Sequence, residues 1–333
     1  MKLGKKVSVV TASVSATVLA ICSAQALAAA SGMMKAGVVS EGTVKLESIA
    51  IPEPAAGQVR IRVIAASVNP VDWKLAGRAA PGSKTIAGRD VAGLIDKVGE
   101  GVTKWKPGDA VVGLAPTGGY AEFAIASADA VAAKPTKMSF DEASGIPVVA
   151  ETAYRALITV GDVQKGQRVL IHGAAGGVGS SAVQIAKAKG AYVIGTASAR
   201  NHDFLKSLGA DETIDYTTTR FEDKVKSVDL VLNTANAETN TRSVAVVKKG
   251  GKLVSVVGAP PADACAAAGI TCGGIGSVNG QMLPAIVELA NAGKFRVNIE
   301  QKLPLADAAK AWELNRTGHT RGKIVLEVAP EAT

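Results

Sequence analysis

The stretch Arg168-Val169-Leu170-Ile171-His172-Gly173-Ala174-Ala175-Gly176-Gly177-Val178-Gly179 decides the fold of this chain. Its apolar beginning predicts a buried strand, and its glycines predict a tight turn. Val183, Ile185 and Ala186 beyond the turn indicate a helix. The backbone N–H groups and the dipole of such a helix favour an anion at the turn. The pattern Ala-x-Gly-x-x-Gly, in which Ala174 replaces the first glycine of a dinucleotide fingerprint, therefore predicts a phosphate-binding turn.

The chain around this turn alternates between apolar strands and helices. We predict strands at 168–172, 191–196, 213–216, 228–232 and 252–257, and helices at 150–160, 203–208, 239–249 and 281–292. Buried strands that alternate with helices form βαβ units around a parallel sheet. The alternation thus predicts an α/β fold, with a doubly wound nucleotide-binding domain that we place at residues 150–288.

The segment before this domain is rich in short strands. Residues 58–63 alternate strictly between polar and apolar side chains, which is typical of a half-buried strand. Further short strands, separated by turns that contain Pro or Gly, continue to about Ala133 and indicate a small β-barrel. The tail of the chain ends on another apolar strand. We therefore predict a β-rich domain at 34–149, to which residues 289–330 return.

The N-terminus has the three parts of a signal peptide. Three lysines lie within the first six residues, an apolar run follows, and Ala26-Leu27-Ala28 supplies a cleavage site. We predict that residues 1–28 are a signal peptide and that the mature protein is periplasmic or secreted, with no membrane span left. A start of translation at Met33 or Met34 would instead leave the protein in the cytoplasm.

Composition limits the class of partner. The formal net charge is +8, but no block of basic residues appears and aromatic residues make up only 4% of the chain, so a nucleic-acid partner is not predicted. Cys265 and Cys272 remain after the leader. They would either form a small disulfide, as an oxidising compartment favours, or stay as two apolar thiols.

The end of the second predicted strand selects the dinucleotide. An NAD site would place Asp or Glu there to bind the ribose hydroxyls, but residues 196–201 contain no carboxylate. Ser198 and Arg200 would instead hold a 2′-phosphate, with Tyr216 beside it. The alternative is that Ser198 caps the next helix and Arg200 is solvated. We predict NADPH.

Several further motifs carry a family resemblance. They are 68–74, 88–93, 98–99, 107–109, 119–123, 151–154, the glycine-rich turn and 321–326. On these motifs, nearly all of the chain from Met34 to Val328 resembles the zinc-independent quinone oxidoreductase branch of the medium-chain dehydrogenase/reductase superfamily. The resemblance implies a GroES-like barrel, a Rossmann domain, NADPH in the cleft between them and a possible homodimer.

The resemblance also implies chemistry without a metal. The zinc branches of the superfamily use a Cys and a His-Glu pair, and here Asn69 and Arg89-Asp90 stand at the expected positions. The chain holds only three histidines, so no metal ligand is predicted. We predict a metal-free oxidoreductase that transfers hydride from NADPH to a small quinone or α,β-unsaturated carbonyl substrate. The alternatives are an exported binding or scaffold protein without turnover, and a related enoyl-thioester reductase.

The strand-end positions and the family resemblance together predict the site residues. Asn69, Lys74 and Tyr120 are the predicted catalytic donors. The alternatives are that Lys74 is an exposed lysine and that Tyr120 packs in the barrel. His172 is predicted to be a packed core residue. The predicted cofactor-binding residues are Asn69, Thr152, Gly173, Ala174, Ala175, Gly176, Gly177, Val178, Ser198, Arg200, Asn201, Tyr216, Val257 and Gly258.

Overall fold

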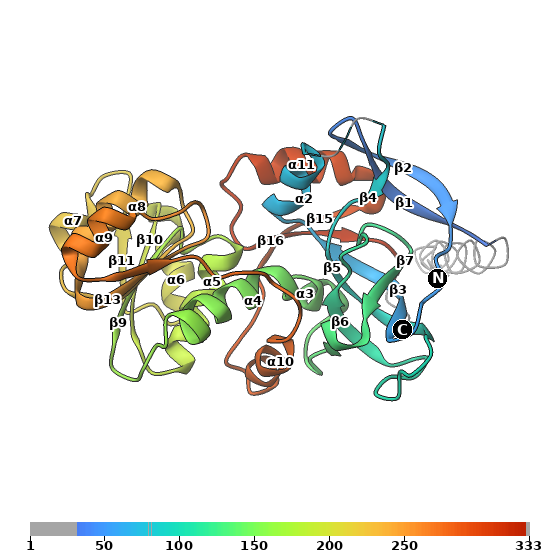
Figure 1. The fold of residues 1–333 in the computed structure, drawn as a ribbon, viewed down its shortest axis with the longest axis horizontal. Coiled ribbons are helices and arrows are strands. Elements are labelled where there is room, and N and C mark those ends of the chain that lie inside the picture. The colour runs from blue at the N-terminus through green and yellow to red at the C-terminus, as the bar shows by residue number, and fades with distance from the viewer. Residues whose placement is uncertain (1–31, 79, 81, 331–333) are drawn as a thin grey trace, which may run out of the picture.

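A parallel sheet forms the first of two α/β units that lie side by side (Figure 1). The structure is a computed structural model that describes residues 32–78, 80 and 82–330. The sheet order is β11-β10-β9-β12-β13-β14, with all pairs parallel. The strands are β9 (Arg168–His172), β10 (Tyr192–Ala197), β11 (Glu212–Asp215), β12 (Val228–Asn233), β13 (Val247–Ser255) and β14 (Thr271–Gly273). This order confirms the doubly wound sheet and places the switch point, where such sheets bind ligands, between β9 and β12.

The second unit is the GroES-like domain. Its larger sheet has the order β15-β16-β3-β5-β6-β8, with β7 also paired to β3, and a smaller sheet has the order β2-β1-β4. Its strands are β1 (Met33–Ser40), β2 (Thr43–Ala50), β3 (Gln58–Ser67), β4 (Thr85–Ile86), β5 (Asp90–Val98), β6 (Ala110–Leu114), β7 (Phe123–Ser127), β8 (Val131–Ala133), β15 (Ile299–Pro304) and β16 (Lys323–Glu327). Because β16 pairs with β3, the strand near the C-terminus belongs to this unit.

Helices cover the parallel sheet and fill the space between the units. They are α2 (Pro70–Ala76), α3 (Phe140–Ser144), α4 (Pro147–Tyr154), α5 (Gly177–Ala188), α6 (His202–Ser207), α7 (Phe221–Lys224), α8 (Ala237–Ser243), α9 (Ala262–Ala268), α10 (Leu283–Asn291) and α11 (Ala308–Arg316). A π-helix (Arg155–Val160) continues α4. Among these described helices, none combines the length and the apolarity that a bilayer crossing requires.

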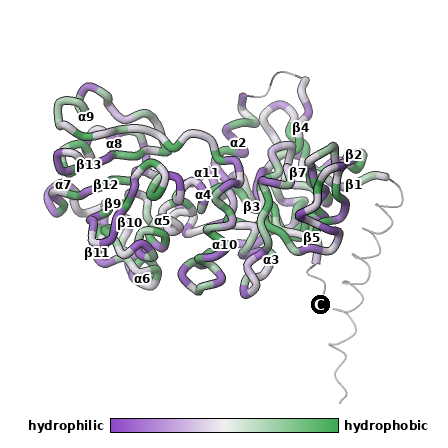
Figure 2. Tube along the Cα trace, turned by 60° about the horizontal axis from the view of Figure 1, so that its bottom comes forward, coloured by the Kyte–Doolittle hydropathy of each residue, from purple (hydrophilic) through white to green (hydrophobic). Residues whose placement is uncertain are grey.

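One apolar core runs through both units. Ile64 and Val112 of the GroES-like sheets belong to the same buried cluster as Ile171 and Val193 of the parallel sheet, with Ala150 of α4 among them. Figure 2 shows hydrophobic residues along β3 and β5 in the GroES-like unit. The shared core fixes the two units against each other, so the cleft between them has a defined shape.

Two features of the parallel-sheet unit differ from the sequence predictions. The helix predicted at 239–249 ends at Ser243, and β13 already begins at Val247, because Val247 pairs with Val228 of β12. The short strand β14 was not predicted. Cys272 lies on it and is disulfide-bonded to Cys265 of α9. The proposed leader lies outside the described residues, and the domain boundaries remain predictions.

Candidate active site

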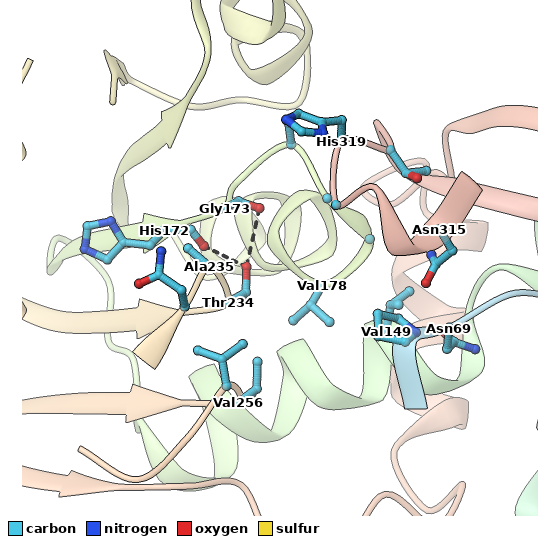
Figure 3. Close-up of a pocket in the computed structure, with 18 of the residues that line it drawn as sticks. Asn69, Val149, His172, Gly173, Val178, Thr234, Ala235, Val256, Asn315 and His319 are labelled. Carbon is cyan, nitrogen blue, oxygen red and sulfur yellow. Dashed lines mark hydrogen bonds between the residues drawn. The ribbon is translucent and has the colours of Figure 1, made fainter. Parts of the chain in front are cut away.

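The glycine-rich turn holds its shape through close backbone packing. Gly173 has φ +67°, and a Cβ there would lie 2.6 Å from Thr234 Oγ1. That hydroxyl donates to the His172 carbonyl at 2.7 Å (Figure 3). A Cβ on Gly179 would lie 2.2 Å from the Gly173 carbonyl oxygen. Both glycines are therefore required by the fold itself.

Gly176 is different. A Cβ at this position would meet nothing nearer than the Gly173 carbonyl oxygen, at 3.5 Å. Its φ of −74° and ψ of 178° suit any residue. Gly176 is the N-cap residue of α5 and faces open space, so no internal contact of the protein requires a glycine there. It leaves room for a group that approaches the helix N-terminus.

A cleft of about 840 Å³ separates the two units and contains this turn. Figure 3 shows Val178 between Val256 on one side and Val149 and Asn69 on the other. The charged residues that line the cleft, within the described part of the chain, are all cationic: Lys74, Arg78, Arg200, Arg242, Arg316 and Lys323. Arg242 is paired with Glu222 and Lys323 with the buried Asp90, while the other four cations form no ion pair among the described residues. Four unpaired cations and no acid in its lining give the cleft the charge that binds a polyanion.

One end of the cleft lies beyond β10. This end is lined by the four residues predicted to bind the cofactor beyond the second strand: Ser198, Arg200, Asn201 and Tyr216. Ser198 precedes a short helical turn but makes no side-chain cap, and its hydroxyl instead accepts from Asn201. Tyr216 is 57% exposed. Arg200 is exposed, and among the described residues its guanidinium donates one hydrogen bond, to the His319 carbonyl at 3.4 Å, so most of its donors are available for an anion.

The other end rests on a buried polar network. Lys323 Nζ donates to Asn69 Oδ1 at 2.6 Å and to the Val68 carbonyl at 2.8 Å. Asn69 Nδ2 in turn donates to Asp90 Oδ2 at 2.8 Å. Ser67 and the Val148 N–H also donate to the Asp90 carboxylate, which lies 3.7 Å from Lys323 Nζ. Both ends of the Asn69 amide are thus committed, so this residue positions the cleft wall.

Tyr120 is linked to this network through Asp72, which accepts a hydrogen bond from the Asn69 N–H. It is fully buried, and its hydroxyl donates to Asp72 Oδ2 at 2.8 Å. It lines neither of the two cavities described here. The packed position that the sequence left open for Tyr120 is therefore the one it occupies. Burial, more than the neighbouring carboxylate, raises the pKa of its hydroxyl well above the usual range.

Asp72 carries a testable pH dependence. Burial raises its pKa to about 7, against the effect of the hydrogen bond from the Asn69 N–H. Between about pH 4 and pH 7 the folded protein keeps a proton that the unfolded chain has lost. The free energy of unfolding should therefore fall as pH rises through this range, by about 4 kcal/mol at most. Asp72→Asn should flatten this slope in urea titrations from pH 4 to pH 8.

The exposed Glu313 supplies the matched control. Glu313→Gln removes a carboxylate on the surface of α11 and should leave the slope as it is in the wild type. An unchanged slope in Asp72→Asn would show that this carboxyl does not keep its proton in the folded state.

His172 is a packed residue, as predicted. It is 2% exposed, and its Nδ1 lies 3.2 Å from Thr196 Oγ1 while its Nε2 lies 3.1 Å from Ser243 Oγ. Because the Ser243 hydroxyl already donates to the Thr239 carbonyl, Nε2 carries the proton and donates. Burial lowers the pKa of His172 to about 3, so the ring stays neutral.

A second cavity of about 720 Å³ adjoins the cleft. Val71, Val148, Thr152 and Val256 line both cavities. The rest of the second cavity is formed mainly by small residues of the segments 255–260 and 272–278. Thr152 is 6% exposed, and no hydrogen bond of its hydroxyl occurs among the described residues. Its hydroxyl is therefore available where the two cavities meet.

The remaining predicted residues divide between these places. Lys74 lines the cleft but is exposed, with its ammonium over the Trp73 ring. Val257 lines the cleft, and Gly258 the second cavity. Ala174 is fully buried and faces Gly195 of β10, away from the cleft, while the other turn residues at 173 and 175–178 line it.

Sequence reasoning missed the C-terminal wall of the cleft. Asn315, His319, Thr320, Gly322 and Lys323 all line it. The Gly322 N–H donates to the Ala175 carbonyl and so ties this wall to the turn. The signal was present in the motif at 321–326, but no pattern assigned a role to its lysine. Within the described ranges, no group of three or more His, Cys, Asp or Glu residues could hold a metal ion.

Comparisons with known proteins agree with this architecture. Residues 55–136 match the alcohol dehydrogenase GroES-like domain family, and residues 208–326 match a family described as zinc-binding dehydrogenase. The chloroplastic quinone-oxidoreductase QR1 of Triphysaria versicolor is 34% identical, over 84% of this chain and 92% of its own length. This chain belongs to the quinone oxidoreductase-like branch of the medium-chain dehydrogenase/reductase superfamily.

Two more members of this superfamily show how far the likeness extends. A 2-methylene-furan-3-one reductase of Solanum lycopersicum is 36% identical, over 87% of this chain and 77% of its own length. The solved structure of the quinone oxidoreductase from Coxiella burnetii superposes with a TM-score of 0.81 at 34% identity, covering 89% of this chain and 99% of the other. The predicted family and the two-domain fold are confirmed.

Proposed function

We propose that this protein is an NADPH-dependent, metal-free reductase that transfers hydride to a quinone or an α,β-unsaturated carbonyl compound. The coarser statement, that it is a nicotinamide-dependent oxidoreductase, follows from its place in the superfamily. The finer proposal is carried by the cleft, whose charged residues are six cations, with no acid in the described lining, and which opens into the second cavity.

The residues of the cleft fit the proposed cofactor. Gly176 leaves space at the N-terminus of α5, where the helix dipole and backbone N–H groups favour a pyrophosphate. Ser198 and Arg200 supply a hydroxyl and a cation for a 2′-phosphate, and Tyr216 presents an exposed ring beside them. Thr152 would lie at the nicotinamide end, because it borders both cavities.

The chemistry divides between the cofactor and the chain. The reduced nicotinamide, when bound, supplies a hydride. The residues of the chain bind and orient the two reactants. The cationic cleft holds the phosphates of the cofactor, and the Thr152 hydroxyl lies where cofactor and substrate would meet. The Lys323–Asn69–Asp90 network keeps the wall of the cleft rigid. Asn69 is not free to bind a metal, because both ends of its amide are already hydrogen-bonded.

The choice of cofactor gives a direct test. Arg200→Ala should weaken NADPH binding about tenfold or more, because a charge-assisted bond to the 2′-phosphate is lost, and should leave NADH binding unchanged. Both dissociation constants can be measured by nicotinamide fluorescence. Arg220→Ala is the control, since the Arg220 side chain is 74% exposed and outside the cleft. Equal affinity of the wild type for both cofactors, unaltered by Arg200→Ala, would refute the NADPH preference.

We propose further that the chain is exported. The support is the three-part N-terminal pattern together with the Cys265–Cys272 disulfide, since such bonds persist in oxidising compartments. N-terminal sequencing of protein isolated from its native cells should find a start at or near Ala29. An intact Met1, or a start at Met33 or Met34, would contradict export.

A further inference from the structure

Arg89 places a positive charge at the second cavity. Within the described residues, it is the one charged residue that lines this cavity. The rest of the lining is apolar, small or hydroxyl-bearing, so nothing of opposite charge faces the guanidinium there. A cation in such surroundings acts over a short range with little screening by water.

The Arg89 guanidinium lacks a partner in the part of the chain that the structure describes. No hydrogen bond or ion pair to it occurs among the described residues, and its Nε is buried without an acceptor. The neighbouring carboxylate of Asp90 is already satisfied by Ser67, Asn69 and the Val148 N–H. A buried donor without an acceptor is unfavourable, so such a group in a cavity is suited to a ligand that supplies the acceptor.

The backbone around Arg89 is fixed. Its carbonyl accepts from the Ala115 N–H at 2.7 Å. Gly88 has φ +81°, and a Cβ there would lie 2.1 Å from the Tyr120 ring. Since Tyr120 is itself fully buried and bonded to Asp72, the segment that carries Arg89 rests on a rigid base. The backbone therefore fixes the point on the cavity wall from which the Arg89 side chain extends.

The position of the cavity determines which part of a ligand Arg89 would meet. Val71, Val148, Thr152 and Val256 are shared with the cofactor cleft, so the second cavity begins where the proposed nicotinamide end finishes. A substrate that receives hydride must lie at this junction. The part of it that extends into the second cavity reaches the wall to which Arg89 belongs.

We propose that Arg89 is the oxyanion-binding residue of the reductase, and that it holds the carbonyl oxygen of the quinone or enone on which negative charge develops. This role of Arg89 rests on the proposed function, and it would make Arg89 the residue that selects acceptors with a carbonyl group. Hydrogen bonds from a guanidinium to an oxyanion are charge-assisted and stronger than neutral ones. They strengthen as the charge forms, which is the condition for accelerating the step.

Reduction of an enone adds a hydride, which leaves the reduced nicotinamide as its C–H bond breaks, and a proton, which comes from water. One C–H bond forms at the β-carbon with the hydride, whose two electrons come from the reduced nicotinamide. The π electrons of the C=C bond form a new double bond between the α-carbon and the carbonyl carbon. The carbonyl oxygen becomes an enolate oxygen that accepts hydrogen bonds from Arg89. A proton from water then adds to the α-carbon and restores the carbonyl. For a quinone, the corresponding product is a hydroquinone monoanion, which takes its proton from water. Arg89 keeps its own proton throughout.

Steady-state kinetics give the first test. Arg89→Met should lower kcat/KM with menadione and with methyl vinyl ketone by about 10²-fold to 10³-fold, as loss of an oxyanion donor does. Arg89→Lys, which keeps the charge, should recover part of this loss. The dissociation constant of NADPH should not change in either variant. Arg220→Met, on an exposed arginine outside both cavities, is the matched control.

A binding experiment tests the same residue without turnover. Para-nitrophenol, whose ionised form absorbs visible light, resembles the oxyanion and can be titrated with the protein in the presence of NADP⁺. In the wild type, the pKa of the bound phenol should be about one pH unit or more below that of the free phenol, because a nearby cation favours the phenolate. In Arg89→Met this difference should vanish. The melting temperature of Arg89→Met should be unchanged or higher, since a buried donor without a partner is removed.

The outcomes separate this inference from the function on which it rests. If the wild type oxidises NADPH with neither menadione nor methyl vinyl ketone, but binds para-nitrophenolate through Arg89, the proposed reaction fails and the anion site stands. If the wild type is active and Arg89→Met keeps its kcat/KM, Arg89 has no such role. Lost activity together with an unaltered phenol titration would equally overturn the inference.

Discussion

Replacing Lys323 with methionine should lower the free energy of unfolding by about 3 to 5 kcal/mol. The lysine is 3% exposed, and its ammonium satisfies Asn69 Oδ1 and the Val68 carbonyl. Without it, the fully buried carboxylate of Asp90 loses the cation 3.7 Å away. An uncompensated buried charge and an unbonded carbonyl are among the few mechanisms that produce so large a loss. Urea unfolding followed by circular dichroism measures it.

A second variant separates the charge from the packing. Asp90→Asn combined with Lys323→Met removes both charges, so the double variant should be more stable than Lys323→Met alone. Lys310→Met on the exposed surface of α11 controls for the loss of a lysine and should change stability by less than about 0.5 kcal/mol. If Lys323→Met unfolds at the wild-type urea concentration, the buried pair contributes nothing to stability.

Burial shifts the pKa values of both members of the pair. Burial raises the pKa of Asp90 and lowers that of Lys323, while each charge opposes the shift of the other. Each group therefore depends on the charge of the other to stay ionised in the interior. Asn69 lies between them, so the wall of the cleft that faces the proposed nicotinamide depends on this ion pair.

The parallel sheet and one end of the cleft could be predicted because both follow from local patterns. Apolar strands that alternate with helices indicate a parallel sheet, and the carboxyl ends of neighbouring parallel strands meet at one edge. Ser198, which follows β10, and Tyr216, which follows β11, therefore had to lie near the turn. Their place in the cleft required no knowledge of long-range contacts.

The other end of the site depends on contacts that no local pattern records. Lys323 bonds to Val68, 255 positions earlier in the chain, and Tyr120 bonds to Asp72 across 48 positions. A lysine in an apolar strand and a tyrosine after two glycines each suit an exposed or a buried position equally. Only the pairing of β16 with β3 brings Lys323 to the cleft wall. The helix predicted at 239–249 was wrong for a similar reason, since its Val247 pairs with Val228 of β12 and belongs to the sheet.

The glycines of the turn allow a prediction that separates folding from binding. Gly179→Ala should lower the free energy of unfolding by about 3 kcal/mol, at the upper end of what overpacking causes. Its Cβ would lie 2.2 Å from the Gly173 carbonyl oxygen and 2.6 Å from Ala174 Cα, both backbone atoms that cannot move without disturbing the turn. Gly176→Ala should leave the melting temperature unchanged, because its Cβ meets only one atom, at 3.5 Å, and its backbone angles suit alanine.

Gly176→Ala should weaken NADPH binding although it leaves the melting temperature unchanged. A methyl group at this position occupies the space that a pyrophosphate needs at the N-terminus of α5, so NADPH affinity should fall by at least about tenfold, or ~1.4 kcal/mol. Nicotinamide fluorescence measures the affinity, and the unchanged melting temperature of the free protein shows that the fold is intact. The loss should be the same for NADH, since both cofactors share the pyrophosphate, whereas Arg200→Ala should affect NADPH alone. A Gly176→Ala variant that binds NADPH as the wild type does would place the phosphates elsewhere, and the cationic cleft would then need a different occupant.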